Sequence, residues 1–445
     1  MKYNNTLERF AAFSQASLRQ YDSELHGLLI QEHERQQNTL ALVASCSIEA
    51  ASASACEGLF LDNVTAEGYP SARYHAGCEV IDKIEDLAIQ RAKDTFGAQY
   101  ANIQPWSASI ANQSVIASLL TPGDTVLGMD LDAGGHLSHG AKVNLSGKHY
   151  DARYYGVGRD GYLDFENIRQ IALDCKPKLI IAGTTAYPRT IDFEKFRLIA
   201  DEVGSFLLAD ITHIAGLVAA GLHPSPIDVA HVTTMCTHKQ LFGPRGGLIL
   251  SGKESKMTVG SSAVPLHQQL NRAVFPLFQG APAPAKLAAK ANALLYAGSR
   301  EFRELSMDIK VLASEAAALF EQFGARVMFG GTDNHIVIVD VLTSFGITGI
   351  IAQKALEECG IIVNKNRIVN DSKPVRIASG IRIGTNSMAA RKLSVDALNK
   401  IIQLILRVLQ NVRSIDDTDY FLSPDIVSET NSAVRNLCQQ FPIYK

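Results

Sequence analysis

The most specific chemistry in the sequence involves a carboxylate, a histidine and a lysine. Asp210 ends an apolar run, and His238 and Lys239 follow within Thr233–Gly247, which reads TTMCTHKQLFGPRGG. A lysine in an apolar, glycine-rich loop is desolvated, which lowers its pKa and frees the amine for Schiff-base chemistry. A carboxylate at the end of a strand can keep a pyridinium nitrogen protonated. Alone, such a lysine is usually a surface residue and such an aspartate a helix cap, but together they favour a pyridoxal site.

Hydroxyl side chains at the start of a predicted helix suit the phosphate of such a cofactor. Ser107 and Ser109 lie in the run WSASIAN (106–112), where a helix begins. Backbone amides and hydroxyls at a helix N-terminus bind phosphate, although isolated serines there are often ordinary caps. His136, in GGHLSHG, can stack on a flat ring, although a lone histidine is more often a turn residue whose hydrogen bonds are satisfied locally.

Alternating strands and helices must position these residues. Short apolar runs at 125–131, 177–184, 205–210 and 246–250 predict strands, and the run at 192–203 predicts a helix with an acidic start. The apolar residues are continuous rather than alternating, which indicates strands buried on both faces. The sequence therefore predicts an α/β fold with a mainly parallel sheet covered by helices.

Helical segments flank this region and suggest three parts. Residues 83–96 form an amphipathic pattern that ends at Gly97, a natural helix stop. A helix from about residue 287 is expected to lead into a smaller α+β domain with strands at 335–341, 360–363 and 380–384. We expect an N-terminal helical arm suited to packing on another subunit, a large domain and a small C-terminal domain, over residues 1–40, 41–295 and 296–445.

The overall composition excludes several classes of protein. The chain has 445 residues, 42 Lys and Arg against 45 Asp and Glu, and a net charge of −3, which argues against nucleic acid or an anionic membrane as the partner. No apolar stretch reaches the length of a membrane helix, and no signal peptide is expected at the start. The seven cysteines stand singly, which favours reduced thiols in a cytoplasmic protein over disulfides or a metal site.

Several blocks of the sequence resemble the serine hydroxymethyltransferases, which are pyridoxal 5'-phosphate enzymes of fold type I. The resemblance is nearly full-length and keeps the family's order. Its most specific blocks are AEGYPSARY (66–74), PGDTVLGMDL (122–131), GGHLSHG (134–140), THKQLFGPRGG (237–247), GGTDNH (330–335), VNKN (363–366) and SGIRIGT (379–385).

The resemblance implies a site for the cofactor. Lys239 would form the Schiff base, Asp210 would pair with the pyridine nitrogen, and His136 would stack on the ring. The other cofactor-binding positions implied are Thr65, Ser107, Ala108, Ser109, Thr185, His213, His238, Gly280 and Ala281, of which Gly280 and Ala281 would come from the partner subunit.

The resemblance also implies sites for the two substrates, an amino acid and tetrahydrofolate. Arg382 would bind the amino acid's carboxylate, since a guanidinium group binds a carboxylate through two parallel hydrogen bonds. Ser45, Glu67, His75 and His213 would complete the amino-acid pocket, and Glu67 would act as the acid–base group. The folate-binding positions implied are Glu67, Tyr74, Leu131, Gly135, Leu137, Phe275 and Asn366, with Thr185 along the same wall.

Several departures from the family pattern fall within the site. Thr65 and His75 stand where the family has tyrosines, and Cys46, Ser47 and Ile48 replace Glu, Asn and Tyr. The family's His and Gly before the phosphate helix are Trp106 and Ala108, its threonine before Thr-His-Lys is Cys236, and its second glycine of a pair is Ala281.

Losing two tyrosines removes bulk, and a histidine adds a group that titrates near neutrality. These changes suggest room for a substituent at Cα, as in 2-methylserine, with D-alanine or a similar amino acid as the other partner. The alternatives are an ordinary serine enzyme, a folate-independent aldolase or transaldolase, and a weakly catalytic relative kept for binding. Because the family's sites use residues of both subunits, we expect a homo-oligomer, at least a dimer.

Overall fold

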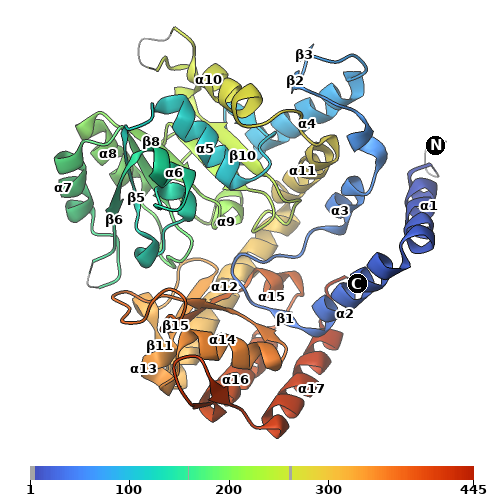
Figure 1. The fold of residues 1–445 in the computed structure, drawn as a ribbon, viewed down its shortest axis with the longest axis vertical. Helices are drawn as coiled ribbons and strands as arrows, with labels where there is room; N and C mark the ends of the chain where they lie inside the picture. Colours follow the sequence, from blue (N-terminus) through green and yellow to red (C-terminus); the bar gives the residue numbers. More distant parts are fainter. Residues whose placement is uncertain (1–5, 159, 260–262, 445) are drawn as a thin grey trace.

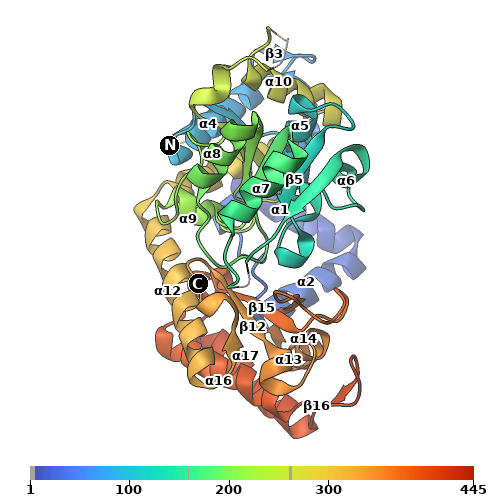
Figure 2. The same cartoon turned by 90° about the vertical axis from the view of Figure 1, so that its left-hand side faces the viewer.

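A computed structural model describes residues 6–158, 160–259 and 263–444. The helices and strands form two regions, each built around a β-sheet, with two N-terminal helices at one side (Figure 1). Figure 2, turned by 90°, shows the region of the larger sheet above and the C-terminal region below. Within the described ranges, no helix combines the length and the apolar character that crossing a membrane requires.

Seven strands form the larger sheet, in the order β4–β10–β9–β8–β7–β5–β6. Neighbouring strands from β6 to β9 run parallel, whereas β10 is antiparallel to β9 and to β4. The predicted α/β class with a mainly parallel sheet is confirmed. The strands are β4 (Tyr100–Asn102), β5 (Thr125–Met129), β6 (Asp151–Tyr155), β7 (Leu179–Gly183), β8 (Phe206–Asp210), β9 (Val232–Cys236) and β10 (Gly247–Ser251).

Both faces of this sheet are buried, as its continuous apolar strands require. In β7, Leu179 and Ile181 join one apolar cluster, whereas Ile180 and Ala182 join another on the opposite face. Helices supply the partners on each side. They include α3 (Ala51–Glu57), α4 (Glu79–Phe96), α5 (Ala108–Leu119), α6 (Leu145–His149), α7 (Phe165–Cys175), α8 (Phe193–Val203), α9 (Ala215–Ala219), α10 (Leu266–Arg272) and α11 (Pro284–Ala297).

The ends of the helices follow from local chemistry. α4 begins four residues before the predicted start, and it ends at Gly97, whose φ of 71° is the left-handed conformation of a C-terminal stop. α8 begins after Asp192, whose carboxylate accepts a hydrogen bond of 3.1 Å from the Lys195 amide. The predicted helices at 83–96 and 192–203 are therefore confirmed.

The C-terminal region is built on a second sheet of order β11–β12–β15–β14, antiparallel throughout. Its strands are β11 (Arg326–Val327), β12 (Ile336–Asp340), β14 (Asn364–Asn366) and β15 (Gly380–Gly384). Its helices are α12 (Arg300–Gln322), α13 (Val341–Phe345), α14 (Gly349–Glu358), α15 (Asn386–Ala390), α16 (Val395–Asn411) and α17 (Pro424–Gln440). A hairpin of β16 (Arg413–Ser414) and β17 (Tyr420–Phe421) precedes α17.

The helix that enters this region is not the one expected. The prediction placed the connecting helix from about residue 287, but α11 packs on α3 and α4 beside the larger sheet. The next helix, α12, contacts β11, α15 and α16 and carries the chain into the second region. The alanine-rich stretch predicted a helix correctly, but its small side chains serve close packing rather than a connection.

The N-terminal helices project from the body of the chain (Figure 1). α1 (Thr6–Tyr21) and α2 (Ser23–Asn38) have no fully buried residue, and Tyr21, Leu25 and Leu28 expose apolar side chains. After them, β1 (Leu40–Ala41) pairs in parallel with β13 (Ile361–Ile362) of the C-terminal region before the chain reaches the larger sheet.

Candidate functional site

A cavity of about 360 Å³ lies where the parallel strands β7, β8 and β9 end, the edge at which open α/β sheets bind ligands. Ten of the predicted site residues line it: Ser45, Ser107, Ala108, Ser109, His136, Thr185, Asp210, His213, His238 and Lys239. The structure therefore brings together residues that are separated by almost two hundred positions in the sequence.

Lys239 lies in the loop after β9, and its amine lies against a histidine. The Nζ atom is 2.9 Å from His213 Nε2. Burial lowers the pKa of Lys239, although Cys236 and Asp210 oppose that shift. The pKa of His213 also falls well below its usual value, because the ring is buried and lies close to the lysine. The loop therefore holds an amine that loses its proton more readily than a solvated lysine.

Asp210, at the end of β8, is buried but extensively hydrogen-bonded. Its Oδ2 atom accepts hydrogen bonds from Asn112 Nδ2 at 2.8 Å and His139 Nε2 at 2.9 Å, and the Thr212 amide donates to Oδ1 at 3.0 Å. Burial would raise the pKa of Asp210, but the hydrogen bond and charge of His139 hold it well below its usual value. Asp210 is therefore a carboxylate inside the cavity wall.

His136 is fixed by the turn that contains it. Its Nδ1 atom lies 2.7 Å from Ser138 Oγ and accepts a hydrogen bond of 3.1 Å from the Ser138 amide. Burial, with the neighbouring His139, lowers the pKa of His136 to about 4. The ring at the cavity is therefore a neutral imidazole near pH 7.

The start of α5 forms another part of the wall of the cavity. Ser107 is the N-cap residue, and its Oγ accepts a hydrogen bond of 3.2 Å from the Ile110 amide. Arg245 brings a positive charge nearby, with Nη1 3.3 Å from His238 Nε2. A helix N-terminus, serine hydroxyls and an arginine together form a site for an anion.

Arg382 projects from β15 of the second sheet. Its Nη1 atom donates to the Thr185 carbonyl at 2.5 Å, and Nε donates to Asn364 Oδ1 at 3.2 Å. Burial lowers the pKa of Arg382 to about 10, so the group remains a cation at neutral pH. Arg382, which is partly buried, thus brings a positive charge from the second sheet to Thr185 at the edge of the larger sheet.

A second cavity, of about 570 Å³, shares His136 and Thr185 with the first. Four predicted folate-binding residues line it: Leu131, Gly135, Leu137 and Asn366. Three cationic side chains, Lys365, Arg367 and Arg376, also line it, and Arg367 is paired with Asp132 of the same cavity. The cavity therefore combines apolar walls with positive charges, which suits a flat ring attached to a carboxylate.

The remaining predicted residues form a separate group near the hairpin β2 (Gly68–Tyr69) and β3 (Ala72–Arg73). His75 Nε2 is 3.1 Å from Glu67 Oε2, and a Cβ atom on Gly280 would lie 3.5 Å from Glu67 Oε1. The rings of Tyr74 and Phe275 meet edge to face, 5.6 Å apart.

None of these residues lines the cavity around Lys239, nor do Thr65 and Ala281. Arg382 does not line it either, but it donates to the carbonyl of Thr185, which does. Within the described part of one chain, the predicted site is therefore divided into two groups. Glu67, Thr65 and His75 are at least partly exposed in this chain, so the second group is open to contact from outside it.

The first cavity fits pyridoxal phosphate in both its volume and its polar groups. Its volume is in the range of small-molecule sites. Thr212 Oγ1, His213 Nδ1 and His238 Nδ1 are buried at its wall and find no hydrogen-bond partner among the described residues. Buried polar atoms normally have partners, so these atoms indicate a ligand with polar groups of its own.

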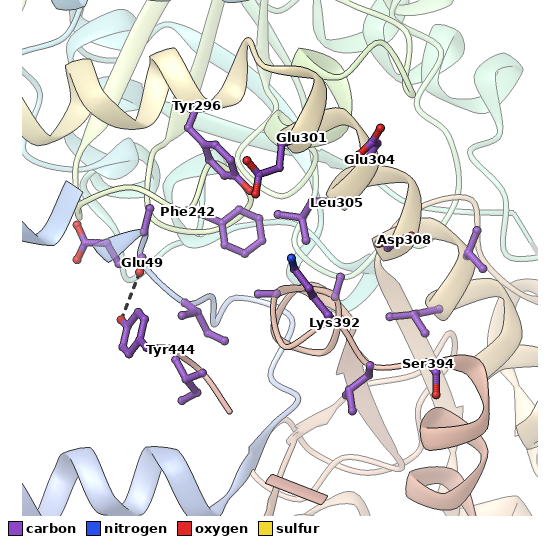
Figure 3. A pocket seen from close by; sticks show the side chains of 18 of the residues that line it. Glu49, Phe242, Tyr296, Glu301, Glu304, Leu305, Asp308, Lys392, Ser394 and Tyr444 are labelled. Carbon is purple, nitrogen blue, oxygen red and sulfur yellow. Dashed lines mark hydrogen bonds between the residues drawn. The ribbon is translucent and has the colours of Figure 1, made fainter. Parts of the chain in front are cut away.

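The largest volume among the cavities described here belongs to a third one, but that cavity lacks the predicted chemistry. It measures about 600 Å³ and lies between α12, the end of α15 and the segment around Glu49 (Figure 3). Acidic side chains of α12 line it, with Lys392 opposite. The Tyr444 hydroxyl donates to the Glu49 carbonyl at 3.3 Å. None of the predicted site residues reaches this cavity.

Two residues that hold the site were missed in the sequence. Asn112 donates to Ser138 Oγ at 2.9 Å as well as to Asp210, and it accepts from Thr234 Oγ1 at 2.5 Å. His139 lies in the same GGHLSHG block as His136 and could have been noticed as a second imidazole there. Nothing in the sequence indicates that Asn112 faces inward, because the predicted site residues of this helix, Ser107 and Ser109, lie only at its start.

Comparisons with known proteins agree with this geometry. The family model described as serine hydroxymethyltransferase matches residues 18–405. Among curated proteins, the chain is 48% identical over 392 residues to a serine hydroxymethyltransferase of Borrelia turicatae (strain 91E135), covering 87% of this chain and 94% of the relative. It is 44% identical over 432 residues to a serine hydroxymethyltransferase of Wolbachia pipientis subsp. Culex pipiens (strain wPip), covering 97% and 98% of the two chains.

Proposed function

Because this chain belongs to the serine hydroxymethyltransferase family, whose members use pyridoxal phosphate and pass a one-carbon unit to tetrahydrofolate, we propose that its preferred donor is an α-substituted serine. The specific donor proposed is 2-methylserine, with D-alanine or a similar amino acid as the product of its cleavage. The single observation that carries this proposal is the pair of small or polar residues, Thr65 and His75, that flanks Glu67 where the family has tyrosines.

We take the two sheets as the centres of a large and a small domain, with the boundary near residue 295. The cofactor would lie at the edge of the large domain. Lys239 would link to it covalently, and His213, 2.9 Å from the amine, would help to hold the amine in place. The cofactor's phosphate would lie at Ser107–Ser109 and the start of α5, near His238.

Asp210 would remain a carboxylate and accept a hydrogen bond from the protonated ring nitrogen of the cofactor. When bound, the cofactor supplies a ring that withdraws electrons from the bonds at the amino acid's Cα. His139 and Asn112 keep the carboxylate charged and oriented, and the neutral ring of His136 would cover the cofactor's face.

Arg382 would bind the substrate carboxylate, with Ser45 beside it. Its guanidinium group is buried, charged and already held by Thr185 and Asn364, so it loses little freedom when it binds. A carboxylate fixed at this point orients the Cα–Cβ bond of the substrate relative to the large domain.

Glu67 would move the proton on the hydroxymethyl oxygen, and His75 is placed to share that proton. The two side chains are 3.1 Å apart, close enough for a hydrogen bond. A phenol at position 75 would donate its hydrogen bond to Glu67, whereas a ring nitrogen of an imidazole can donate or accept one.

Tetrahydrofolate would occupy the second cavity, which shares His136 and Thr185 with the cofactor site. The apolar residues Leu131 and Leu137 suit its ring, and Asn366 can bond to its polar edge. Lys365 and Arg376 would attract its carboxylates, whereas Arg367 is already paired with Asp132.

A complete site would need two copies of the chain. The group around Glu67, with Tyr74, Phe275, Gly280 and Ala281, does not reach the cavity around Lys239 of the same chain. We therefore propose a homo-oligomer, at least a dimer, in which each copy supplies its Glu67 group to the other's cavity. We also propose a cytoplasmic location, which the seven free cysteines support.

The test compares turnover of L-serine and 2-methyl-L-serine, each with and without tetrahydrofolate. We expect a higher kcat/KM for 2-methylserine and a strict need for tetrahydrofolate. The double variant T65Y/H75Y should move the preference toward L-serine by about tenfold, because an added methyl group is worth about 1–3 kcal/mol in a filled pocket. H149Y, at an exposed position, is the control. A clear preference of the unmodified enzyme for L-serine overturns the proposal, and rates independent of tetrahydrofolate would favour an aldolase.

A further inference from the structure

A lysine on α11 is buried against the segment that leads to Ser107 at the start of α5. Lys290 is 2% exposed, and its Nζ atom donates to three backbone carbonyls: Ile103 at 2.5 Å, Gly247 at 3.0 Å and Pro105 at 3.1 Å. It does not line the cavity around Lys239.

The three acceptors belong to the two segments that form the cavity wall. Ile103 and Pro105 lead from β4 to Ser107, the N-cap of α5. Gly247 begins β10, directly after the loop that carries Lys239. The Gly247 amide also donates to the Pro105 carbonyl at 2.8 Å, so the side chain of Lys290 reinforces an existing backbone connection.

The backbone around this amine is tightly packed. A Cβ atom on Gly246 would collide with Cε of Lys290, and a Cβ atom on Gly247 would collide with the Ser107 carbonyl. Gln279 holds the same segment from the other side, because its Nε2 donates to the Gln104 carbonyl at 3.0 Å. The segment before Ser107 is thus held through its peptide groups, and Lys290 provides two of those contacts.

The three carbonyl acceptors favour an ammonium group over a neutral amine, whereas burial acts against the charge and lowers the pKa of Lys290 to about 7. An ammonium group has three hydrogens for three carbonyls, whereas a neutral amine has two hydrogens and would turn a lone pair toward the third carbonyl. The charge has no ion-pair partner among the described residues, and Glu85, whose negative charge favours it, is already bonded to Arg73 and Gln104. An anion bound above Ser107 would therefore gain from this buried charge.

We propose that Lys290 is a positioning residue for the cofactor's phosphate: it holds the turn before Ser107 against the loop of Lys239 and adds a positive charge beneath the phosphate. It does not touch the reacting atoms. The proposal goes beyond the choice of amino-acid substrate and does not depend on it.

The test measures the affinity of the apoenzyme for pyridoxal 5'-phosphate and for pyridoxal, which lacks the phosphate, by titration of the absorbance of the bound cofactor. The variants are K290M, which keeps the length of the side chain, and K290Q, which keeps one donor without a charge. The control is K286M, one turn earlier on the same helix, where the lysine forms a half-exposed ion pair with Glu57.

We expect K290M and K290Q to bind pyridoxal phosphate at least tenfold more weakly while their affinity for pyridoxal changes less than twofold. K286M should leave both affinities unchanged. Equal losses for the two ligands would mean that Lys290 only supports the fold, and no loss for either would mean that it does not act on the phosphate; both results overturn the proposal. Circular dichroism of each apoenzyme establishes that it is folded, and K290Q decides the outcome if K290M is not.

Discussion

Asp210 keeps its negative charge inside the protein because other residues donate the hydrogen bonds that water would donate to an exposed carboxylate. Asn112, His139 and the Thr212 amide each donate a hydrogen bond to it, and Thr234 in turn fixes Asn112. A buried carboxylate without such donors would take up a proton and could no longer hold a protonated ring nitrogen. The charge of this one side chain is therefore a property of four residues from separate segments.

Replacing His139 tests this arrangement. In H139L, Asp210 loses one donor, and we expect the affinity for pyridoxal phosphate to fall by about 10- to 100-fold, as for the loss of a hydrogen bond to a charged group worth about 1.5–3 kcal/mol. Titration of the apoenzyme with the cofactor measures it. H149L, at an exposed position, should bind normally. An unchanged affinity in H139L would show that Asp210 does not need this histidine.

At the scale of elements, the strands of the larger sheet could be predicted because each is a continuous apolar run. The prediction placed Asp210 at a strand end, and the parallel arrangement then carried His213 and the Lys239 loop to the same edge. The prediction of the connecting helix was wrong, because a run of alanines indicates that a helix packs closely but does not indicate which element it packs against. Asn112 could not be predicted, because which face of α5 turns inward depends on strands that lie far away in the sequence.

The contact between β10 and the start of α5 leaves no room for a side chain. In G247A, the new methyl group would collide with the Ser107 carbonyl, so the two elements must separate. We expect the free energy of unfolding to fall by about 1–3 kcal/mol, as in other overpacked sites. Urea denaturation of the apoenzyme measures it.

The matched control for that substitution is G58A. Gly58 follows α3 with φ of −82°, and a Cβ atom there would meet nothing within 4 Å. G58A should be as stable as the unmodified protein, within about 0.5 kcal/mol. If both variants lose stability equally, the contact with Ser107 is not the cause.

At the scale of the whole molecule, two incomplete groups of functional residues in one chain predict complementation between chains. K239A and E67A should each be inactive alone. Mixed oligomers would contain sites in which both residues are intact, and for dimers mixed equally at random we expect about a quarter of the unmodified activity. The measurement is the activity after the two variants are expressed together. Activity no higher than the sum of the separate variants would place Glu67 and Lys239 in the same chain's site.

Buried neutral histidines make the whole fold sensitive to acid. His231 accepts a hydrogen bond of 2.9 Å from the Leu207 amide, and burial lowers its pKa to about 4. Between pH 6.5 and 4 the unfolded chain binds a proton at this residue that the folded chain does not, so stability is lost as the pH falls. From pH 7 to pH 5 the loss from this residue alone should be about 1–2 kcal/mol.

Urea denaturation of the apoenzyme at both pH values measures this loss. H231Q, which keeps an acceptor for the Leu207 amide, should lose less stability on acidification than the unmodified protein. An equal loss in the two proteins would mean that His231 is not among the residues that titrate.

The short segment at residues 40–46 is held by the C-terminal region of the chain. β1 is paired with β13, the Gly384 amide donates to the Leu42 carbonyl, and Asn386 donates to the Ala44 carbonyl, so Ser45 is fastened to the sheet that carries Arg382. A chimera that exchanges C-terminal halves between relatives to change substrate selectivity would therefore also need residues 40–46 from the same parent. Otherwise the hybrid would combine Ser45 of one parent with Arg382 of the other.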